Sequence, residues 1–195
     1  MYKKIEEFRK STYDIDPIFL ERWSPRSFLE KEIPTDILNS IFEAARWAPS
    51  AGNIQPWRFV VAKEQSDRKR FLSFINEGNV VWCQKAPVLV AVISKTEEKR
   101  FGGFNQAHAF DTGAAWGYLA LEAARKGLIT HAMGGFNKEK AIEKLNIPQG
   151  YAVHAIVAIG YQGEKEALNE ELRKREKPSD RKQIEDFISE GVFND

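Results

Sequence analysis

The sequence lacks several features that would assign a protein to a class at once. Its 195 residues include one cysteine, Cys83, so no disulfide can form within the chain and no oxidising compartment is required. The first ten residues contain no apolar run of the kind found in secretory signals. No stretch approaches the roughly 20 consecutive apolar residues of a membrane span. We therefore expect a cytoplasmic protein with no membrane partner.

An excess of one charge is also absent. The formal net charge is +1, so no overall field selects nucleic acid or an anionic membrane as a partner. The basic run Arg173–Arg175 is interleaved with acidic neighbours, namely Glu170, Glu171 and Glu176. Such a mixture predicts a solvated helix face and no nucleic-acid contact.

Motifs for metals, nucleophiles and dinucleotides are missing as well. His108, His131 and His154 lie far apart in the sequence and match no metal-ligand spacing, so no metal is expected. We expect His154, inside an apolar run, to be structural and Cys83 to be a buried thiol. No Gly-x-Gly-x-x-Gly motif follows a predicted strand, which argues against a Rossmann nicotinamide domain.

The composition does provide enough apolar material for one domain over residues 1–195. Apolar residues make up 43% of the chain. Helical periodicity and stop signals predict helices at about 36–47, 67–77, 105–126 and 138–145. Apolar runs predict strands at 57–62, 87–93 and 151–160. Strands that alternate with helices indicate a sandwich of helices and sheet.

Individual residues refine these elements. Thr35 is expected to cap the first helix, and Gly78 and Gly127 to end the second and third. The small residues Gly113–Gly117 let another backbone approach the third helix closely. The last thirty residues are highly charged yet contain several apolar side chains: Ile184, Phe187, Ile188, Val192 and Phe193. We expect this tail to dock onto another surface, for which a second subunit is one candidate.

Arg22, Ser24 and Arg26 form the first candidate binding element. Pro25 favours extended geometry at Ser24, and extended residues two apart project to the same side. Two guanidinium groups that flank a hydroxyl suit a phosphate, because each guanidinium offers paired donors. For the triplet alone, a polar surface loop is the simpler explanation, and that alternative stays open.

Two loops form the second and third candidate elements. Ser50, Asn53 and Gln55 supply donors and acceptors that suit a planar ring with imide edges. The adjacent Gly134 and Gly135 allow backbone N–H groups to face a ligand. Taken singly, each segment is also compatible with an ordinary turn.

Together, the three elements resemble the nitroreductase family. The resemblance rests on the order Arg22-x-Ser24-x-Arg26, Pro49-Ser50-x-x-Asn53-x-Gln55-Pro56-Trp57 and Gly134-Gly135, with Asp111–Ala115 and Gly127-Leu128 between. It runs from about residue 18 to 190. It implies an α+β fold, a three-layer α/β/α sandwich with a central mixed, mainly antiparallel sheet. It also implies an obligate homodimer with FMN at the subunit interface.

The resemblance assigns the phosphate end of FMN to basic and hydroxyl side chains. Arg22, Ser24 and Arg26 are expected to hold the phosphate and the ribityl chain. Arg181, together with Lys182, matches the basic residues near the C-terminus that complete phosphate binding. The tail from about 164 to 195 is expected to dock on the partner subunit.

The flavin ring is assigned to the remaining elements. Ser50, Asn53 and Gln55 are expected to line the same or the opposite side of the pocket, with Ser50 and Asn53 supplied by the partner chain. Asn79 falls where many members place an amide near the pyrimidine edge. The backbone of Gly134–Gly135 is expected beside the ring and its N5.

The resemblance implies an FMN-dependent oxidoreductase that works by a ping-pong mechanism. NADH or NADPH would give hydride to flavin N5, and nitroaromatics, quinones or similar flat acceptors would then be reduced. No catalytic side chain is expected, because the flavin supplies the chemistry. The alternatives are a flavin reductase, dehalogenase or enone reductase of the same superfamily, or a protein that only stores or senses FMN.

Two positions depart from the family pattern. Some members have an acidic residue where Gly134 stands, and some have a lysine where Trp82 stands. These differences concern redox tuning and substrate choice. Trp82 is expected to belong to the core, with a place in the pocket wall as the alternative.

Overall fold

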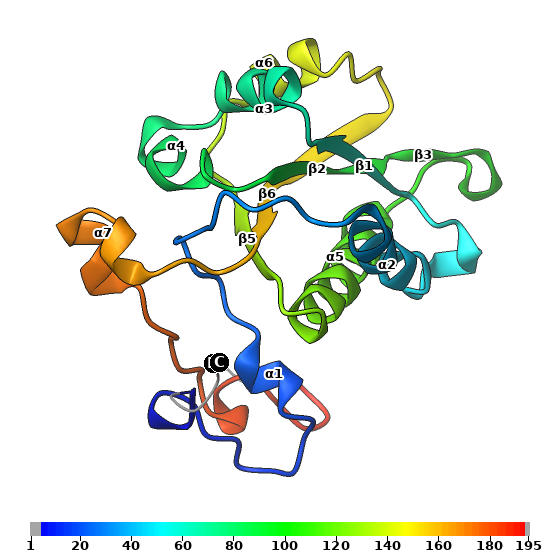
Figure 1. The fold of residues 1–195 in the computed structure, drawn as a ribbon. Coiled ribbons are helices and arrows are strands. Elements are labelled where there is room, and N and C mark those ends of the chain that lie inside the picture. The colour runs from blue at the N-terminus through cyan, green and yellow to red at the C-terminus, as the bar shows by residue number, and fades with distance from the viewer. Residues whose placement is uncertain (1–4, 194–195) are drawn as a thin grey trace.

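A four-stranded sheet forms the centre of the computed structural model, which describes residues 5–193. The strand order is β1-β2-β6-β5, and every neighbouring pair is antiparallel (Figure 1). The strands are β1 Trp57–Ala62, β2 Val88–Lys95, β5 Ile129–Met133 and β6 Tyr151–Gly160. The described residues contain no parallel strand pair, so the antiparallel part of the expected sheet is confirmed and the mixed part is not seen.

The alternation of side chains along β2 explains why helices cover both faces of the sheet. Leu89, Ala91 and Ile93 belong to one buried cluster, whereas Val88, Val90 and Val92 belong to another. Successive residues of a strand point to opposite faces, and here both sets are apolar. The two buried clusters give the three layers of the expected α+β sandwich.

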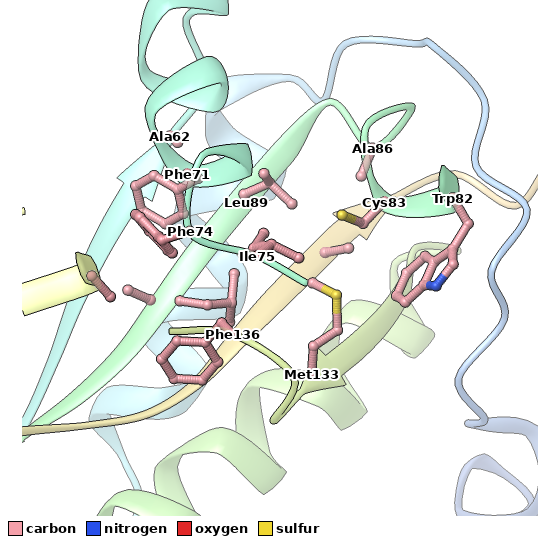
Figure 2. Close-up of a cluster of buried hydrophobic side chains, with 14 of the residues drawn as sticks. Ala62, Phe71, Phe74, Ile75, Trp82, Cys83, Ala86, Leu89, Met133 and Phe136 are labelled. Atoms are coloured by element: carbon pink, nitrogen blue, oxygen red, sulfur yellow. The ribbon is translucent and has the colours of Figure 1, made fainter. Parts of the chain in front are cut away.

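Two helices lie on one face and three on the other (Figure 1). The first face is covered by α2 Thr35–Arg46 and α5 His108–Arg125. The second is covered by α3 Gln65–Leu72, α4 Glu77–Cys83 and α6 Lys138–Lys144. Figure 2 shows the cluster on this second face, where Phe71 and Phe74 lie near Leu89, and Trp82 and Cys83 lie toward Met133.

The helix predicted at 67–77 is wrong in its extent. Helix α3 ends at Leu72, and α4 begins at Glu77 with Gly78 inside it. Between them, Ile75 forms an isolated antiparallel bridge with Phe136, and the Asn76 amide donates to the Gly135 carbonyl at 3.0 Å. These tertiary hydrogen bonds replace helical ones, which a local sequence pattern does not reveal.

Other helix boundaries differ by a few residues. Pro34 occupies the N-cap position of α2, so Thr35 is its first helical residue and not its cap. Helix α5 begins at His108 and not near 105, because the buried Asn105 side chain accepts from the Ala107 amide in the preceding turn. Gly127 follows α5 with a φ of 75°, as expected for a residue that ends a helix.

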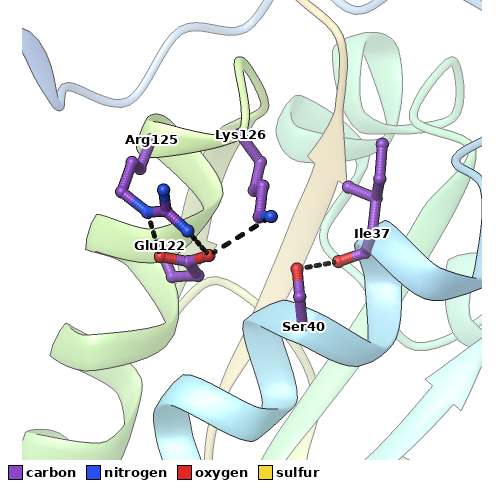
Figure 3. A network of polar contacts seen from close by, with 5 residues as sticks. All are labelled: Ile37, Ser40, Glu122, Arg125 and Lys126. Carbon is purple, nitrogen blue, oxygen red and sulfur yellow. Dashed lines mark hydrogen bonds and ion pairs between the residues drawn. The ribbon is translucent and has the colours of Figure 1, made fainter.

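The end of α5 lies beside α2. Glu122 accepts two hydrogen bonds of 2.7 Å from Arg125, and the Lys126 ammonium lies 3.9 Å away (Figure 3). Ser40 on α2 donates to the Ile37 carbonyl in the same view. Such surface contacts contribute little to stability, and the two helices are joined mainly by their apolar residues.

Segments from the two ends of the chain lie together at the bottom of Figure 1. We call residues 5–22 and 177–193 the terminal lobe. It contains α1 Ile18–Glu21 and the short 3-10 helices Ile5–Glu7 and Ile184–Asp186. The adjoining helix α7, Glu170–Arg175, contributes Leu172 to the main core.

The remaining elements are short. The hairpin of β3 Glu97–Glu98 and β4 Gly103–Phe104 precedes α5. Further 3-10 turns are Ala51–Asn53, Lys99–Phe101 and Lys165–Ala167. None of the helices in the described part of the chain is both long and apolar enough to cross a bilayer.

Candidate functional site

The segment Arg22–Ser27 is held in place by side chains from distant parts of the chain. One oxygen of the Glu176 carboxylate accepts from the amides of Arg26 and Ser27, at 2.8 and 2.9 Å. The Nδ1 atom of His131 donates to the Pro25 carbonyl at 2.9 Å. Contacts to the backbone fix the path of the segment, while the side chains of Arg22, Ser24 and Arg26 remain partly exposed. We call Arg22–Ser27 the arginine segment.

Arg9 holds the opposite end of the arginine segment. Its guanidinium donates to the carbonyls of Leu20 and Arg22, at 2.8 and 2.9 Å. The same group donates to the Ser179 carbonyl at 2.8 Å. Arg9 therefore joins the start of the segment to the C-terminal part of the terminal lobe, which contains Arg181.

Several guanidinium groups approach one another at this place. Burial, and then the Arg181 charge, lower the pKa of Arg22. Burial, Arg181 and Arg22 lower the pKa of Arg9, and Asp180 partly opposes them. Guanidinium groups that lie close enough for one to lower the pKa of another are stabilised by an anion between them. The donor set thus fits a phosphate.

Arg26 lies at the other end of the segment. Burial and the Arg175 charge lower the pKa of Arg26, whereas Glu176 raises it. Arg26 lines a small pocket of about 130 Å³ together with Trp82 and Lys85. Ser24, like Arg22 and Arg26, is partly exposed. All three residues of the triplet are therefore partly accessible.

Gly134 and Gly135 form a turn directly after β5 and beside α4. The Gly135 carbonyl accepts from the Asn79 side-chain amide at 3.2 Å. A Cβ added to Gly135 would lie 2.7 Å from the Asn79 Nδ2 atom, whereas one added to Gly134 would meet nothing within 4 Å. Gly135 is therefore required for close packing, and Gly134 faces open space.

Trp82 belongs to the core, as expected. Its side chain is buried, and its ring lies 4.4 Å from that of His131 and 6.2 Å from that of Phe28, measured between centroids. Because Asn79 and Trp82 share α4, these contacts connect the Gly134–Gly135 turn to the arginine segment. Trp82 therefore packs against His131, the residue that holds the Pro25 carbonyl.

The loop Ser50–Gln55 is shaped by its own residues. The Gln55 amide donates to the Ser50 hydroxyl at 3.0 Å, and the Gln55 side chain donates to the Asn53 side-chain oxygen, also at 3.0 Å. The φ angles of Gly52, Asn53 and Gln55 are 56°, 55° and 54°. Left-handed backbone is uncommon for residues other than glycine and often marks a functional loop.

Within one chain this loop lies apart from the arginine segment. In Figure 1 the cyan loop lies beyond α2 at the right, whereas the blue chain that follows α1 lies at the left, beside β5. The site residues thus form two groups. Arg22, Ser24, Arg26, Asn79, Gly134, Gly135 and Arg181 make up one, and Ser50, Asn53 and Gln55 the other. Lys182 is exposed next to Arg181, and no interaction found in the described residues joins it to Arg22.

No sequence motif marks the three residues that hold the arginine segment, Arg9, His131 and Glu176. The interpretation of Glu176 as part of a solvated helix face is wrong, because this residue is buried. Its partners Arg26 and Ser27 lie 150 and 149 residues away in the sequence, so no local spacing signals the contact. The acidic residues Glu170 and Glu171 are exposed, as expected.

The other singled-out residues have structural environments. His108 and His154 both lie 2.7 Å from the hydroxyl of the buried Ser94. Cys83 is buried, and burial raises the pKa of its thiol to about 12. Among the described residues, no group of three His, Cys, Asp or Glu side chains is arranged to hold a metal ion.

The tail expected from about residue 164 onward divides into two parts. Leu168 and Leu172 pack into the main core of the same chain. Farther on, four large apolar side chains are more than half exposed: Phe187, Ile188, Val192 and Phe193. Docking on a partner therefore stays a prediction for the part of the tail after residue 177.

Comparisons with known proteins agree with this fold. The family model described as the nitroreductase family matches residues 20–81 and 74–161. An NADH dehydrogenase of Thermus thermophilus is 30% identical over 176 residues, which cover 74% of this chain and 85% of that protein.

Solved structures show the same similarity. One described as an oxidoreductase containing FMN has a TM-score of 0.91 and 45% identity, covering 95% of this chain and 96% of that one. A nitroreductase family protein of Clostridium difficile has the same fold, with a TM-score of 0.74 at 20% identity, over 93% of this chain and 100% of that one.

The fold and the matched relatives identify the chain as an α+β oxidoreductase with a mainly antiparallel sheet between two layers of helices. The family match extends over more than half of the chain. The chain belongs to the nitroreductase family.

Proposed function

We propose that this protein is an FMN-dependent oxidoreductase that uses NADH or NADPH as its electron donor. The observation that supports this most directly is the arginine segment, whose backbone is held by Glu176, His131 and Arg9. The guanidinium groups of Arg22 and Arg181 lie close enough for one to lower the pKa of the other. A phosphate monoester is the anion that such a donor set suits.

The Gly134–Gly135 turn suits the flavin ring. The space above Gly134 lets a flat group approach the backbone, and Asn79 is held beside the turn by its bond to the Gly135 carbonyl. When bound, FMN would accept hydride at N5 and pass reducing equivalents to a second substrate, which is the ping-pong scheme. The chain's own residues would bind and orient the ring, and no nucleophilic side chain is needed.

The protein is proposed to work as a homodimer in which each pocket combines two chains. Ser50, Asn53 and Gln55 lie apart from the arginine segment of their own chain, so a partner loop would supply them. An open groove of about 840 Å³ between α1, α2 and α5 is lined by apolar residues such as Phe19, Trp47 and Tyr118. Its exposure in a single chain, together with that of the tail, favours a subunit contact.

The proposed acceptors are nitroaromatics, quinones and other flat electrophiles. A pocket closed by two chains and floored by a planar flavin would select flat molecules by shape. A flavin reductase, dehalogenase or enone reductase would use the same cofactor site with a different acceptor. A protein that only stores or senses FMN would bind the cofactor without oxidising NAD(P)H.

The experiment that tests the proposal is purification followed by cofactor analysis. We expect a yellow protein that releases FMN, not FAD, on denaturation, and that oxidises NADH or NADPH when a quinone or nitroaromatic is added. A colourless protein that FMN cannot reconstitute would overturn the cofactor assignment. Bound FMN without nicotinamide oxidation by any acceptor in a panel would favour the storage or sensing alternative.

A further inference from the structure

Arg9 is a buried cation of the terminal lobe. Only 6% of the residue is exposed. Its Nε atom donates to the Ser179 carbonyl, and its Nη1 atom donates to the carbonyls of Leu20 and Arg22. A buried guanidinium is costly unless it is hydrogen-bonded, and here backbone oxygens from two distant segments satisfy it.

These contacts connect the two parts of the chain that contribute to the phosphate cluster. Arg22 belongs to the first part, and its own carbonyl accepts from Arg9. Ser179 lies two residues before Arg181, and 170 residues separate it from Arg9. Arg9 and Ser179 both lie outside the residues that the family model matches. The connection that they form is therefore not part of the matched region.

Arg9 also adds a third positive charge beside Arg22 and Arg181. Both charges lower the pKa of Arg9, after the larger effect of its burial. Mutual repulsion would separate the two loops that contain Arg22 and Arg181. The hydrogen bonds of Arg9 to the Arg22 and Ser179 carbonyls oppose that separation.

We infer that Arg9 is a positioning residue that holds Arg22 and Arg181 in register for the FMN phosphate. Arg9 acts on the phosphate through the backbone of its neighbours and is not assigned a direct contact with FMN. The inference rests on the proposed function, because it assumes that the arginine segment binds the phosphate.

The test is a double-mutant cycle on FMN affinity, measured by fluorescence titration of the apo-protein. The variants are Arg9→Ala, Arg22→Ala and the double variant, with Arg68→Ala as the matched control. Arg68 is also a partly buried arginine that donates to a distant carbonyl, that of Ala86, but it lies on α3. We expect Arg22→Ala to raise the FMN dissociation constant about ten- to a hundredfold and Arg9→Ala about tenfold. Arg68→Ala should leave it within about twofold of the wild type.

The double variant separates positioning from general destabilisation. If Arg9 acts through Arg22, adding Arg9→Ala to the Arg22→Ala protein should weaken binding much less than about tenfold. An equal loss in both backgrounds would show an independent effect and overturn the inference. If Arg9→Ala does not fold, Arg9→Lys replaces it, since a lysine keeps the charge but not the planar set of donors. Wild-type affinity in a folded Arg9→Lys protein would likewise contradict the inference.

Failure of the underlying function gives a different result. If Arg22→Ala binds FMN as tightly as Arg68→Ala, the arginine segment is not the phosphate site and the proposed function loses its main support. If Arg22→Ala weakens binding and a folded Arg9→Ala does not, only the role of Arg9 is wrong.

Discussion

The arginine segment and the Ser50–Gln55 loop are both expected to contact the cofactor, yet they are built differently. Side chains from three distant places hold the backbone of the arginine segment. The loop is shaped by bonds among its own residues, and its main link to the rest of the chain is the Ala51 amide, which donates to Asp111 at 3.1 Å.

The difference suggests a division of tasks. A charged ligand group needs donors that are already in place, because moving several cations together costs free energy at the time of binding. The arginine segment meets this need within one chain. The loop keeps its amide groups at an exposed edge, where a second subunit can approach them. We therefore expect the free energy of unfolding to fall most when a distant contact to the arginine segment is removed. It should fall less when a contact to the loop is removed.

The largest effect is expected for Glu176→Ala. The substitution leaves the buried amide of Ser27 and the amide of Arg26 without their acceptor. The free energy of unfolding, measured with urea, should fall by about 3 kcal/mol. Asp111→Ala removes one acceptor from the loop and should have about half that effect.

Glu171→Ala is the control for this comparison, because Glu171 is exposed on the adjoining helix α7. Its unfolding free energy should remain within about 0.5 kcal/mol of the wild type. A Glu176→Ala protein as stable as Glu171→Ala would show that the arginine segment does not depend on the distant carboxylate.

An intermediate effect is expected for the two glycines after β5. In Gly135→Ala the new methyl group must displace Asn79, so the unfolding free energy should fall by about 1–3 kcal/mol. In Gly134→Ala the new methyl group lies in open space, so the unfolding free energy should change by less than about 0.5 kcal/mol. Its FMN affinity should nevertheless fall, because the methyl group occupies the space proposed for the ring. Thermal or urea unfolding of apo-protein, paired with FMN titration, separates the two outcomes. Equal stability of the two variants would contradict the packing argument.

The smallest effect concerns pH. Burial is the main cause that lowers the pKa of His131, and the Arg26 charge lowers it further. The hydrogen bond to the Pro25 carbonyl acts in the opposite direction and raises this pKa. The unfolded histidine has a pKa of about 6.5, so the unfolded chain binds more protons as the pH falls. The contribution of neutral His131 to the free energy of unfolding is therefore fully present above about pH 6.5. It is lost as the pH falls from that value to the lower pKa of the histidine in the folded protein.

A non-titrating variant isolates this contribution. His131→Asn retains an N–H donor near the position of Nδ1, and its unfolding free energy should fall less steeply than that of the wild type from about pH 7 to 5. Some slope should remain, because burial also lowers the pKa of His154. Identical slopes in the two proteins would mean that His131 is not a neutral support of the arginine segment.

The same contrast explains how much could be predicted from the sequence. The strands at 57–62 and 151–160 follow from local apolar patterns, and the structure has them at those bounds. The helix predicted at 67–77 is wrong because Ile75 bonds to Phe136, far along the chain. The proposed site residues follow from ordered motifs that are local in sequence. The supports Arg9 and Glu176 were missed because their contacts span up to 170 residues.

The most direct test of the two-chain pocket is FMN stoichiometry in mixed dimers. One chain is Arg22→Ala, and the other is a loop variant with both Asn53 and Gln55 changed to alanine. Each variant alone should bind FMN weakly at both sites. If a pocket combines the arginine segment of one chain with the loop of the other, a mixed dimer has one intact pocket and one pocket with both defects. Tagged and purified mixed dimers should then hold about half of the wild-type FMN. Mixed dimers that bind no better than either parent would contradict a pocket shared between subunits.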